Sequence, residues 1–280
     1  MKDEISAWVE KYWPLPLKFD YTKPVEQEAQ RIAEAIRKKY SLSVLKEYER
    51  RFKADQSATD SQQGWNKERR ELVDFLFSTG MHEIINCDTF QRSRETLRSL
   101  LELLVNEKTP FTLIDFGCGD GKIAIGLCLY LEMLKRCYAI DMLQGAEKRL
   151  EKNILKLSEP EQEKVRKKVI PIRGDFTTEH IRKQVRGIEP GKTDIALSAY
   201  PAINFHDGIL LFSRFTKWYG RIITFYQFGK STKTNEFARE LAEKNYQKEI
   251  WHHGLWVEQT KVETYNGKHT FLMAIIRKYI

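Results

Sequence analysis

The chain has 280 residues, of which 41% are hydrophobic and 31% are charged, and its formal net charge is +8. This balance is typical of a globular protein, and the sequence contains no internal repeat or low-complexity tract. The amino terminus leads into no hydrophobic signal segment, and no window of the sequence approaches the roughly 20 apolar residues that a membrane-spanning helix requires. We therefore expect a cytoplasmic protein with no membrane partner.

The first hundred residues predict a helical extension. Apolar side chains recur there at helical spacing, and Ser41 is a suitable N-cap. Residues 53–64 are polar and lack periodicity, which predicts a linker or loop. The expected helices cover residues 24–39, 42–52, 67–78 and 89–105. The aromatic side chains of the extension either line a ligand pocket or form the core of a small helical layer, and they are Trp8, Tyr12, Trp13, Phe19, Tyr21 and Trp65.

The most informative stretch is the run Thr112-Leu-Ile-Asp-Phe-Gly-Cys-Gly-Asp-Gly-Lys122. It predicts a buried parallel strand, a turn and then a helix. Three glycines in the turn allow positive φ angles and let a ligand approach the backbone closely. The spacing differs from the G-x-G-x-x-G of dinucleotide sites, and the carboxylates of Asp115 and Asp120 would repel a pyrophosphate. The turn therefore indicates a nucleoside cofactor that carries positive charge, and the alternative is a surface turn that binds nothing.

These residues resemble the first motif of the class I S-adenosylmethionine-dependent methyltransferases, which is an acid-x-Gly-x-Gly-x-Gly run after the first strand of the sheet. The match falls on Asp115, Gly117, Gly119 and Gly121. The resemblance implies S-adenosylmethionine as the cofactor. Cys118 is then expected to line the cofactor as a small residue and not to act as a nucleophile.

Further strand ends follow in the order that this family implies. After a crossover helix over residues 123–134, an apolar run ends at Asp141, whose carboxylate is expected to accept hydrogen bonds from the ribose hydroxyls. The next apolar run leads to Asp175 and Phe176, which the resemblance places on the adenine amino group and against the adenine ring. Fourth and fifth strands are expected over residues 193–198 and 220–225. The cofactor-binding residues that the resemblance implies are Asp115, Gly117, Cys118, Gly119, Gly121, Asp141, Met142, Asp175, Phe176 and Ser198.

The carboxyl-terminal region predicts a β-hairpin. Two strand-like runs, over residues 255–264 and 269–277, are joined through Asn266-Gly267, a pair typical of tight hairpin turns. This family ends with such an antiparallel strand. The expected fold class is therefore α/β, with a Rossmann-like, seven-stranded, mostly parallel sheet that ends in an antiparallel hairpin strand. Its methyltransferase domain covers residues 108–280, and the helical extension of residues 1–107 is a candidate cap over the acceptor.

The segment after the fourth strand is the candidate acceptor site. Residues 198–207 depart from the Asn/Asp-Pro-Pro-aromatic motif of adenine methyltransferases and look more like the corresponding loop of small-molecule methyltransferases, which a helix follows, here over residues 209–218. Tyr200 is the candidate to line the transferred methyl group, because an aromatic face tolerates a sulfonium charge. His206 is the candidate general base, because its pKa is naturally close to neutral.

Three functions stay open at this stage. The first is methyl transfer to a small-molecule acceptor by in-line displacement. The second is methyl transfer to RNA or protein through a basic face, for which residues 164–168 form the densest basic run, and the third is a scaffold or regulatory subunit that binds the cofactor without turnover. The four cysteines show no C-x-x-C pairing and no histidines at zinc spacing, so no metal site is expected. The sequence leaves the oligomeric state open.

Overall fold

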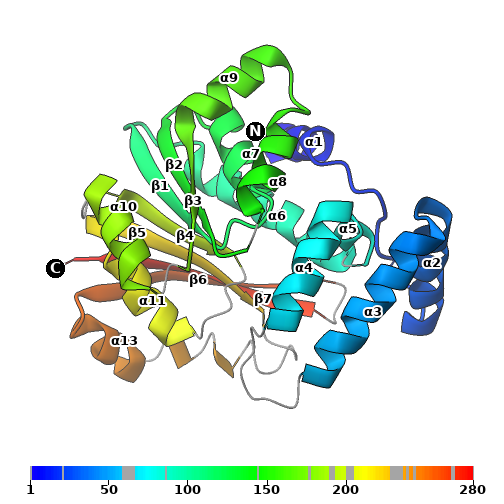
Figure 1. Cartoon of the computed structure of the whole chain (residues 1–280). Coiled ribbons are helices and arrows are strands. Elements are labelled where there is room, and N and C mark those ends of the chain that lie inside the picture. The colour runs from blue at the N-terminus through cyan, green and yellow to red at the C-terminus, as the bar shows by residue number, and fades with distance from the viewer. Residues whose placement is uncertain are drawn as a thin grey trace.

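A computed structural model describes residues 2–20, 22–58, 67–85, 87–143, 145–175, 178–188, 193–199, 205–227, 236–237, 240–241, 244–265 and 269–279. Its centre is a seven-stranded sheet with the strand order β3-β2-β1-β4-β5-β7-β6 (Figure 1). Strands β1 to β5 are parallel, whereas β7 runs antiparallel to both β5 and β6. The strands are β1 Phe111–Phe116, β2 Leu134–Asp141, β3 Val169–Arg173, β4 Thr193–Ala199, β5 Thr216–Gln227, β6 Leu255–Tyr265 and β7 His269–Lys278. The fold class expected from the sequence is confirmed.

Helices cover both faces of this sheet (Figure 1). The described helices are α1 Lys2–Tyr12, α2 Val25–Lys39, α3 Leu42–Ala58, α4 Lys67–Thr79, α5 His82–Ile85, α6 Cys87–Leu104, α7 Lys122–Tyr130, α8 Ala146–Ile154, α9 Glu159–Lys168, α10 Glu179–Ile188, α11 Phe205–Ser213 and α13 Lys244–Trp251. Helices α1, α6, α7, α8 and α9 share one buried cluster with the sheet, and α10, α11 and α13 share a second cluster with its other face.

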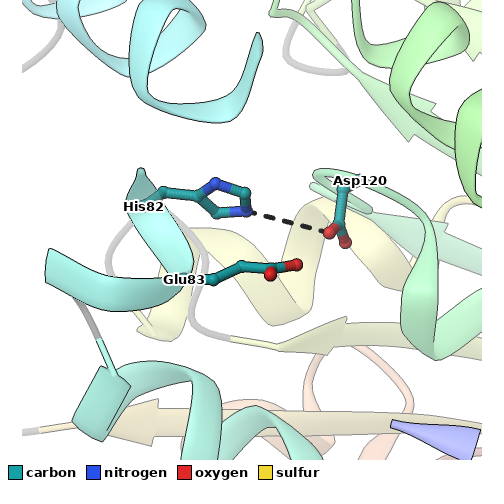
Figure 2. A group of neighbouring side chains, drawn as sticks. All are labelled: His82, Glu83 and Asp120. Carbon is teal, nitrogen blue, oxygen red and sulfur yellow. Dashed lines mark ion pairs between the residues drawn. The ribbon is translucent and has the colours of Figure 1, made fainter. Parts of the chain in front are cut away.

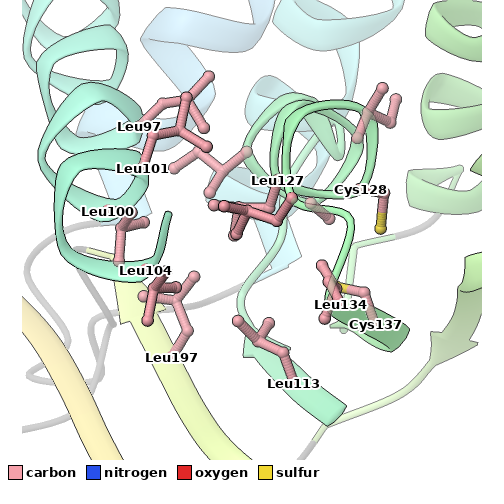
Figure 3. Close-up of a cluster of buried hydrophobic side chains, with 14 of the residues drawn as sticks. Leu97, Leu100, Leu101, Leu104, Leu113, Leu127, Cys128, Leu134, Cys137 and Leu197 are labelled. Carbon is pink, nitrogen blue, oxygen red and sulfur yellow. The ribbon is translucent and has the colours of Figure 1, made fainter. Parts of the chain in front are cut away.

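The alternation of side chains along each strand explains these two layers. Leu113 belongs to the cluster on the α6 and α7 side, whereas its neighbour Ile114 belongs to the cluster on the opposite side. Because both faces are covered, the parallel strands are apolar nearly throughout. Figure 3 shows leucines of α6 packed over this core, and the labelled residues are Leu97, Leu100, Leu101, Leu104, Leu113, Leu127, Cys128, Leu134, Cys137 and Leu197.

The helices before β1 divide into two groups by the core that they join. Helix α1, which the sequence analysis did not predict, buries Ile5 and Val9 in the cluster of the sheet, as α6 buries its leucines. Helices α2 to α5 instead surround a small cluster of their own, centred on Leu72, Leu76 and Met81. The hydrophobic core of the sheet therefore extends across the boundary expected at residue 107, because it includes α1 and α6.

Three sequence predictions of element ends were wrong. Residues 53–58 of the expected linker are helical and continue α3, where Lys53 pairs with Glu49 and the buried Asp55 pairs with Arg69 of α4. Residues 59–64 of that linker lie outside the described part of the chain. The crossover helix α7 ends at Tyr130 and not at residue 134, and β2 already begins at Leu134. The helix expected to reach residue 218 ends at Ser213, and β5 begins at Thr216.

Candidate cofactor site

The glycine turn between β1 and α7 has the backbone that its sequence predicts. Gly117, Gly119 and Gly121 have φ angles of 79°, 60° and 77°, which side chains rarely tolerate. A Cβ atom on Gly121 would lie 2.7 Å from Leu150 Cδ1, whereas one on Gly117 would meet nothing within 4 Å. The turn thus packs against α8 at its far end and is open at its near end, where a ligand can approach.

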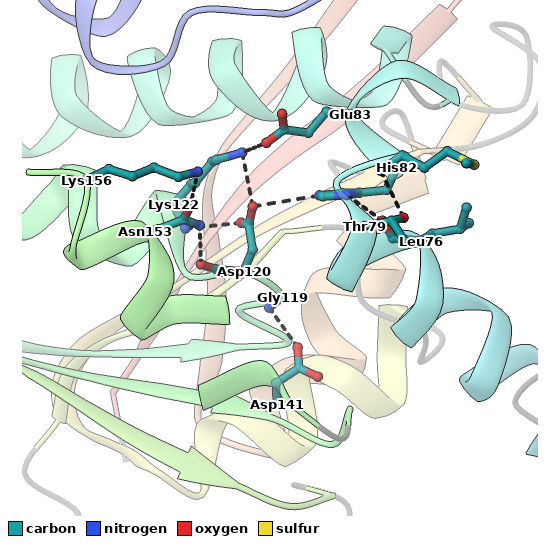
Figure 4. A network of polar contacts seen from close by, with 11 residues as sticks. Leu76, Thr79, His82, Glu83, Gly119, Asp120, Lys122, Asp141, Asn153 and Lys156 are labelled. Carbon is teal, nitrogen blue, oxygen red and sulfur yellow. Dashed lines mark hydrogen bonds and ion pairs between the residues drawn. The ribbon is translucent and has the colours of Figure 1, made fainter. Parts of the chain in front are cut away.

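Asp141, at the end of β2, holds this turn in place. Its Oδ2 accepts a hydrogen bond of 2.7 Å from the Gly119 N–H (Figure 4). Its Oδ1 accepts one of 2.8 Å from the Leu143 N–H. Burial raises the pKa of this carboxyl above its ordinary value, although the two backbone bonds act in the opposite direction. A carboxylate has about four acceptor positions, so Asp141 keeps capacity for hydroxyl donors of a ligand.

Asp115, at the end of β1, is the most unusual acid of the site. It is 2% exposed, and its Oδ2 is buried with no hydrogen-bond partner among the described residues. Burial, with a smaller contribution from the negative charge of Asp141, raises the pKa of Asp115 to about 7. A buried acceptor without a donor is costly, so this position favours a ligand that brings a donor and a positive charge.

A cavity of about 190 Å³ opens beside these groups. Trp13, Phe77 and Ser93 reach it from the helices before β1, and Ala199 reaches it from the end of β4. Trp13 was expected from the sequence as a possible wall of a ligand pocket, whereas Phe77 and Ser93 were not expected there. No local pattern marks those two, because only the packing of α4 and α6 brings them to the turn. The other lining residues are Asp115, Gly117, Cys118, Gly119, Asp120 and Ile123.

A polar network joins the turn to α5 (Figures 2 and 4). Lys122 Nζ lies 3.1 Å from Asp120 Oδ2 and also pairs with Glu83. His82 Nε2 lies 3.8 Å from Asp120 Oδ2, and His82 Nδ1 lies 3.1 Å from the Leu76 carbonyl oxygen. Burial works to raise the pKa of Asp120, but the proximity of His82 and the charge of Lys122 outweigh it and hold that pKa well below its usual range. Asp120 is therefore a permanent anion that anchors α5.

The donor atoms of His82, Glu83 and Asp120 lie within 4.8 Å of one another, a grouping that could hold a metal ion (Figure 2). Lys122 already supplies a cation there, because its ammonium pairs with both carboxylates. A metal ion would have to displace this ammonium. The grouping is therefore an ion-pair network.

The remaining residues expected to contact the cofactor lie at the same edge of the sheet. Met142 follows β2 and Asp175 follows β3. Cys118 lines the cavity, and burial, reinforced by the nearby acids, raises the pKa of its thiol, which disfavours a reactive thiolate. Ser198 is fully buried, and its Oγ donates a hydrogen bond of 3.0 Å to the Phe116 carbonyl oxygen, so its hydroxyl braces β1. Phe176 lies outside the described residues.

Of the two candidate catalytic residues, the structure describes one. His206 lies half-buried in the first turn of α11, on the carboxyl side of β4. The preceding residue, Phe205, is buried and packs edge-on against Tyr226 with ring centroids 5.1 Å apart. Tyr200 lies outside the described residues.

Known proteins are similar to this chain in structure but not in sequence. No protein-family model and no curated protein sequence matches the chain. In structure it is similar to geranyl diphosphate C-methyltransferase from Streptomyces coelicolor, with a TM-score of 0.48, 11% identity, and coverage of 78% of this chain and 86% of that one. It is also similar to TYW2 from M. jannaschii, solved with AdoMet, with a TM-score of 0.46, 18% identity, and coverage of 64% and 74%.

TYW2 from P. horikoshii is a third similar structure, with a TM-score of 0.47 and 14% identity. The match covers 64% of this chain and 61% of that protein, so the chain spans about three fifths of its length. These likenesses concern the fold. The strand order and the antiparallel β7 define the class I methyltransferase fold. None of the described helices is both long and apolar enough to cross a bilayer.

Proposed function

We propose that this protein binds S-adenosylmethionine at the carboxyl ends of β1 and β2 and transfers its methyl group to an acceptor. The observation that carries the proposal is the buried Asp115 Oδ2, which lacks a donor beside a glycine turn that is open to a ligand. Its raised pKa shows that the negative charge of Asp115 is poorly compensated without a ligand. A nucleoside that carries a cationic group would supply the missing charge, whereas a pyrophosphate would add to the repulsion.

Each part of the site has an expected task. Asp115 provides the counter-charge, Asp141 provides acceptors for the ribose hydroxyls, and the glycine backbone permits close approach. Trp13 and Phe77 wall the cavity and exclude water. When bound, S-adenosylmethionine supplies an electrophilic methyl group. The protein then contributes mainly by positioning the acceptor, and His206 accepts a proton only where the acceptor arrives protonated.

We infer a small molecule as the acceptor. The support is the segment after β4, which lacks the motif of base-directed enzymes and places His206 and Asp207 at the start of α11. Helices α1 and α4 provide the cap, since residues on or directly after them wall the cavity. RNA or protein as acceptor, and a scaffold without turnover, are the alternatives that the following experiments separate.

Calorimetric titration tests cofactor binding. The full chain is titrated with S-adenosylmethionine and S-adenosylhomocysteine, with NAD as the control ligand. We expect binding of the first two in the micromolar range and none of NAD. Absence of binding by both would reject the proposal. Once binding is established, release of S-adenosylhomocysteine in an acceptor screen distinguishes an enzyme from a scaffold. For an acceptor that arrives protonated, His206→Ala should then lower turnover without changing the cofactor dissociation constant.

A further inference from the structure

A second cavity, of about 470 Å³, lies between α4 and α8 on the other side of Phe77. We call it the α4–α8 groove. It has an aromatic floor made by Phe75 and Phe77, and its rim carries the side chains of Lys148 and Lys152. Neither the glycine motif nor the proposed methyl transfer accounts for it.

Two guanidinium groups lie over the aromatic rings of this groove. Arg51 lies over Phe75 at 5.3 Å from the ring centroid, and Arg149 lies over Phe77 at 4.7 Å. Each is held by a carboxylate, since Arg51 pairs with Glu47 and Arg149 Nη1 lies 3.0 Å from Asp74 Oδ1. The Arg149 guanidinium is buried and braces Phe77, whereas that of Arg51 is partly exposed, and a planar guanidinium fixed in this way is a surface on which a nucleobase can stack.

The two lysines at the rim add uncompensated charge. Lys148 and Lys152 are one helical turn apart on α8 and both are exposed, and no ion pair joins either to a carboxylate in the part of the chain that the structure describes. Helix α8 also begins at the groove, where Gly145 is its N-cap and provides no side-chain cap. Ammonium groups and the positive end of a helix both favour phosphate.

The densest basic run of the sequence, residues 164–168, is already paired, unlike the two lysines at the rim of the groove. On α9, Lys164 Nζ donates to the Leu129 carbonyl oxygen and Lys168 Nζ donates to that of Leu131, both at the carboxyl end of α7. Lys167 pairs with Glu163, and Arg166 pairs with Glu151. The charges of this run are thus already engaged, whereas no ion pair joins Lys148 or Lys152 to a carboxylate among the described residues.

We propose that the α4–α8 groove binds a nucleotide unit through its phosphate and its base, either in a free nucleotide or in a single strand of nucleic acid. The lysines of the rim contact the phosphate, and the aromatic and guanidinium surface of the floor contacts the base. This site is separate from the cofactor cavity, because the two share only Phe77 among their lining residues.

Fluorescence anisotropy tests the proposal with the full chain and a fluorescein-labelled 12-residue oligouridylate, without S-adenosylmethionine. We expect salt-dependent binding that Lys148→Ala combined with Lys152→Ala weakens at least about tenfold, and a salt slope reduced by about 1.4, since each phosphate contact on a single strand contributes about 0.7. Lys167→Ala, an exposed lysine already paired on α9, is the matched control and should bind within about twofold of the unaltered chain. Both altered lysines are exposed, so the double variant should keep the melting temperature of the parent.

Competition identifies the source of the ligand. Displacement of the oligonucleotide by UDP or AMP at similar concentrations would assign a free nucleotide, and weak displacement by them would assign a strand. Binding of neither oligonucleotide nor nucleotide would overturn the proposal, as would unchanged binding by the double variant or equal displacement by a polyglutamate peptide. Because no cofactor is present, these outcomes do not depend on the proposed methyl transfer.

Discussion

Asp115 makes the stability of the ligand-free protein depend on pH. Its pKa is raised to about 7 in the folded state, so the folded protein holds this proton more tightly than the unfolded chain does. Its contribution to the free energy of unfolding is therefore fully present below about pH 4 and is lost as the pH rises to about 7. A cationic ligand, by contrast, should bind better as Asp115 ionises.

Asp115→Asn removes this titration. The free energy of unfolding of the variant minus that of the parent should be larger at pH 8 than at pH 5. The increase should be on the order of 2 kcal/mol, since one pKa unit corresponds to about 1.4 kcal/mol. Denaturant unfolding of both proteins at the two pH values measures this difference. The same variant should bind S-adenosylmethionine more weakly at pH 8. A difference in stability that stays constant with pH would show that Asp115 does not titrate in this range.

Asp141→Ala should weaken S-adenosylmethionine binding by at least about tenfold, because it removes both the proposed acceptor for the ribose hydroxyls and the bond that holds the Gly119 N–H. Calorimetric titration of the folded variant measures the loss. An unchanged dissociation constant would remove Asp141 from the cofactor site.

Gly121 and Gly117 form a matched pair for the glycine turn. Gly121→Ala should lower the free energy of unfolding by about 1–3 kcal/mol, because the new Cβ is both at positive φ and 2.7 Å from Leu150. Gly117→Ala introduces the same backbone strain, but its Cβ overlaps no neighbouring atom. It should therefore lower the free energy of unfolding less than Gly121→Ala does, and it should weaken cofactor binding more. Denaturant unfolding and calorimetric titration of both variants test this, and equal losses of stability would contradict it.

At the scale of elements, α5 is attached to the glycine turn through Lys122. Its pairs with Glu83 and Asp120 are largely buried, so removing the ammonium leaves two carboxylates without their cation. We expect a coupling of at least about 1 kcal/mol between Lys122→Met and Glu83→Gln in a double-mutant cycle of unfolding free energies. Additive effects of the two substitutions would mean that the pair does not hold α5.

The elements also show what sequence patterns reveal. The strands and the glycine turn were predictable because each depends on local periodicity and spacing, whereas the arrangement of the sheet was expected from the resemblance. The end of α11 was not, because strand β5 extends back to Thr216 only through pairing with Thr193 of β4. Phe77, Ser93 and His82 reach the cofactor cavity or its turn by tertiary packing of α4, α5 and α6, which leaves no local signal in the sequence.

At the scale of the whole molecule, α1 belongs to the core of the sheet. Ile5 is fully buried in that cluster, so Ile5→Ala should lower the free energy of unfolding by about 2–5 kcal/mol. Leu42, which is 68% exposed on α3, is the control, and Leu42→Ala should change it by no more than about 0.5 kcal/mol. Denaturant unfolding measures both. A small effect of Ile5→Ala would show that α1 is an appendage.

Phe77 is a wall common to the cofactor cavity and the α4–α8 groove. Under the two binding proposals, a ligand that displaces this ring on one side would change the free energy of binding on the other. Thermodynamic linkage would then require the two ligands to alter each other's dissociation constants by the same factor. One aromatic side chain on α4 would thus allow occupation of one cavity to be sensed at the other.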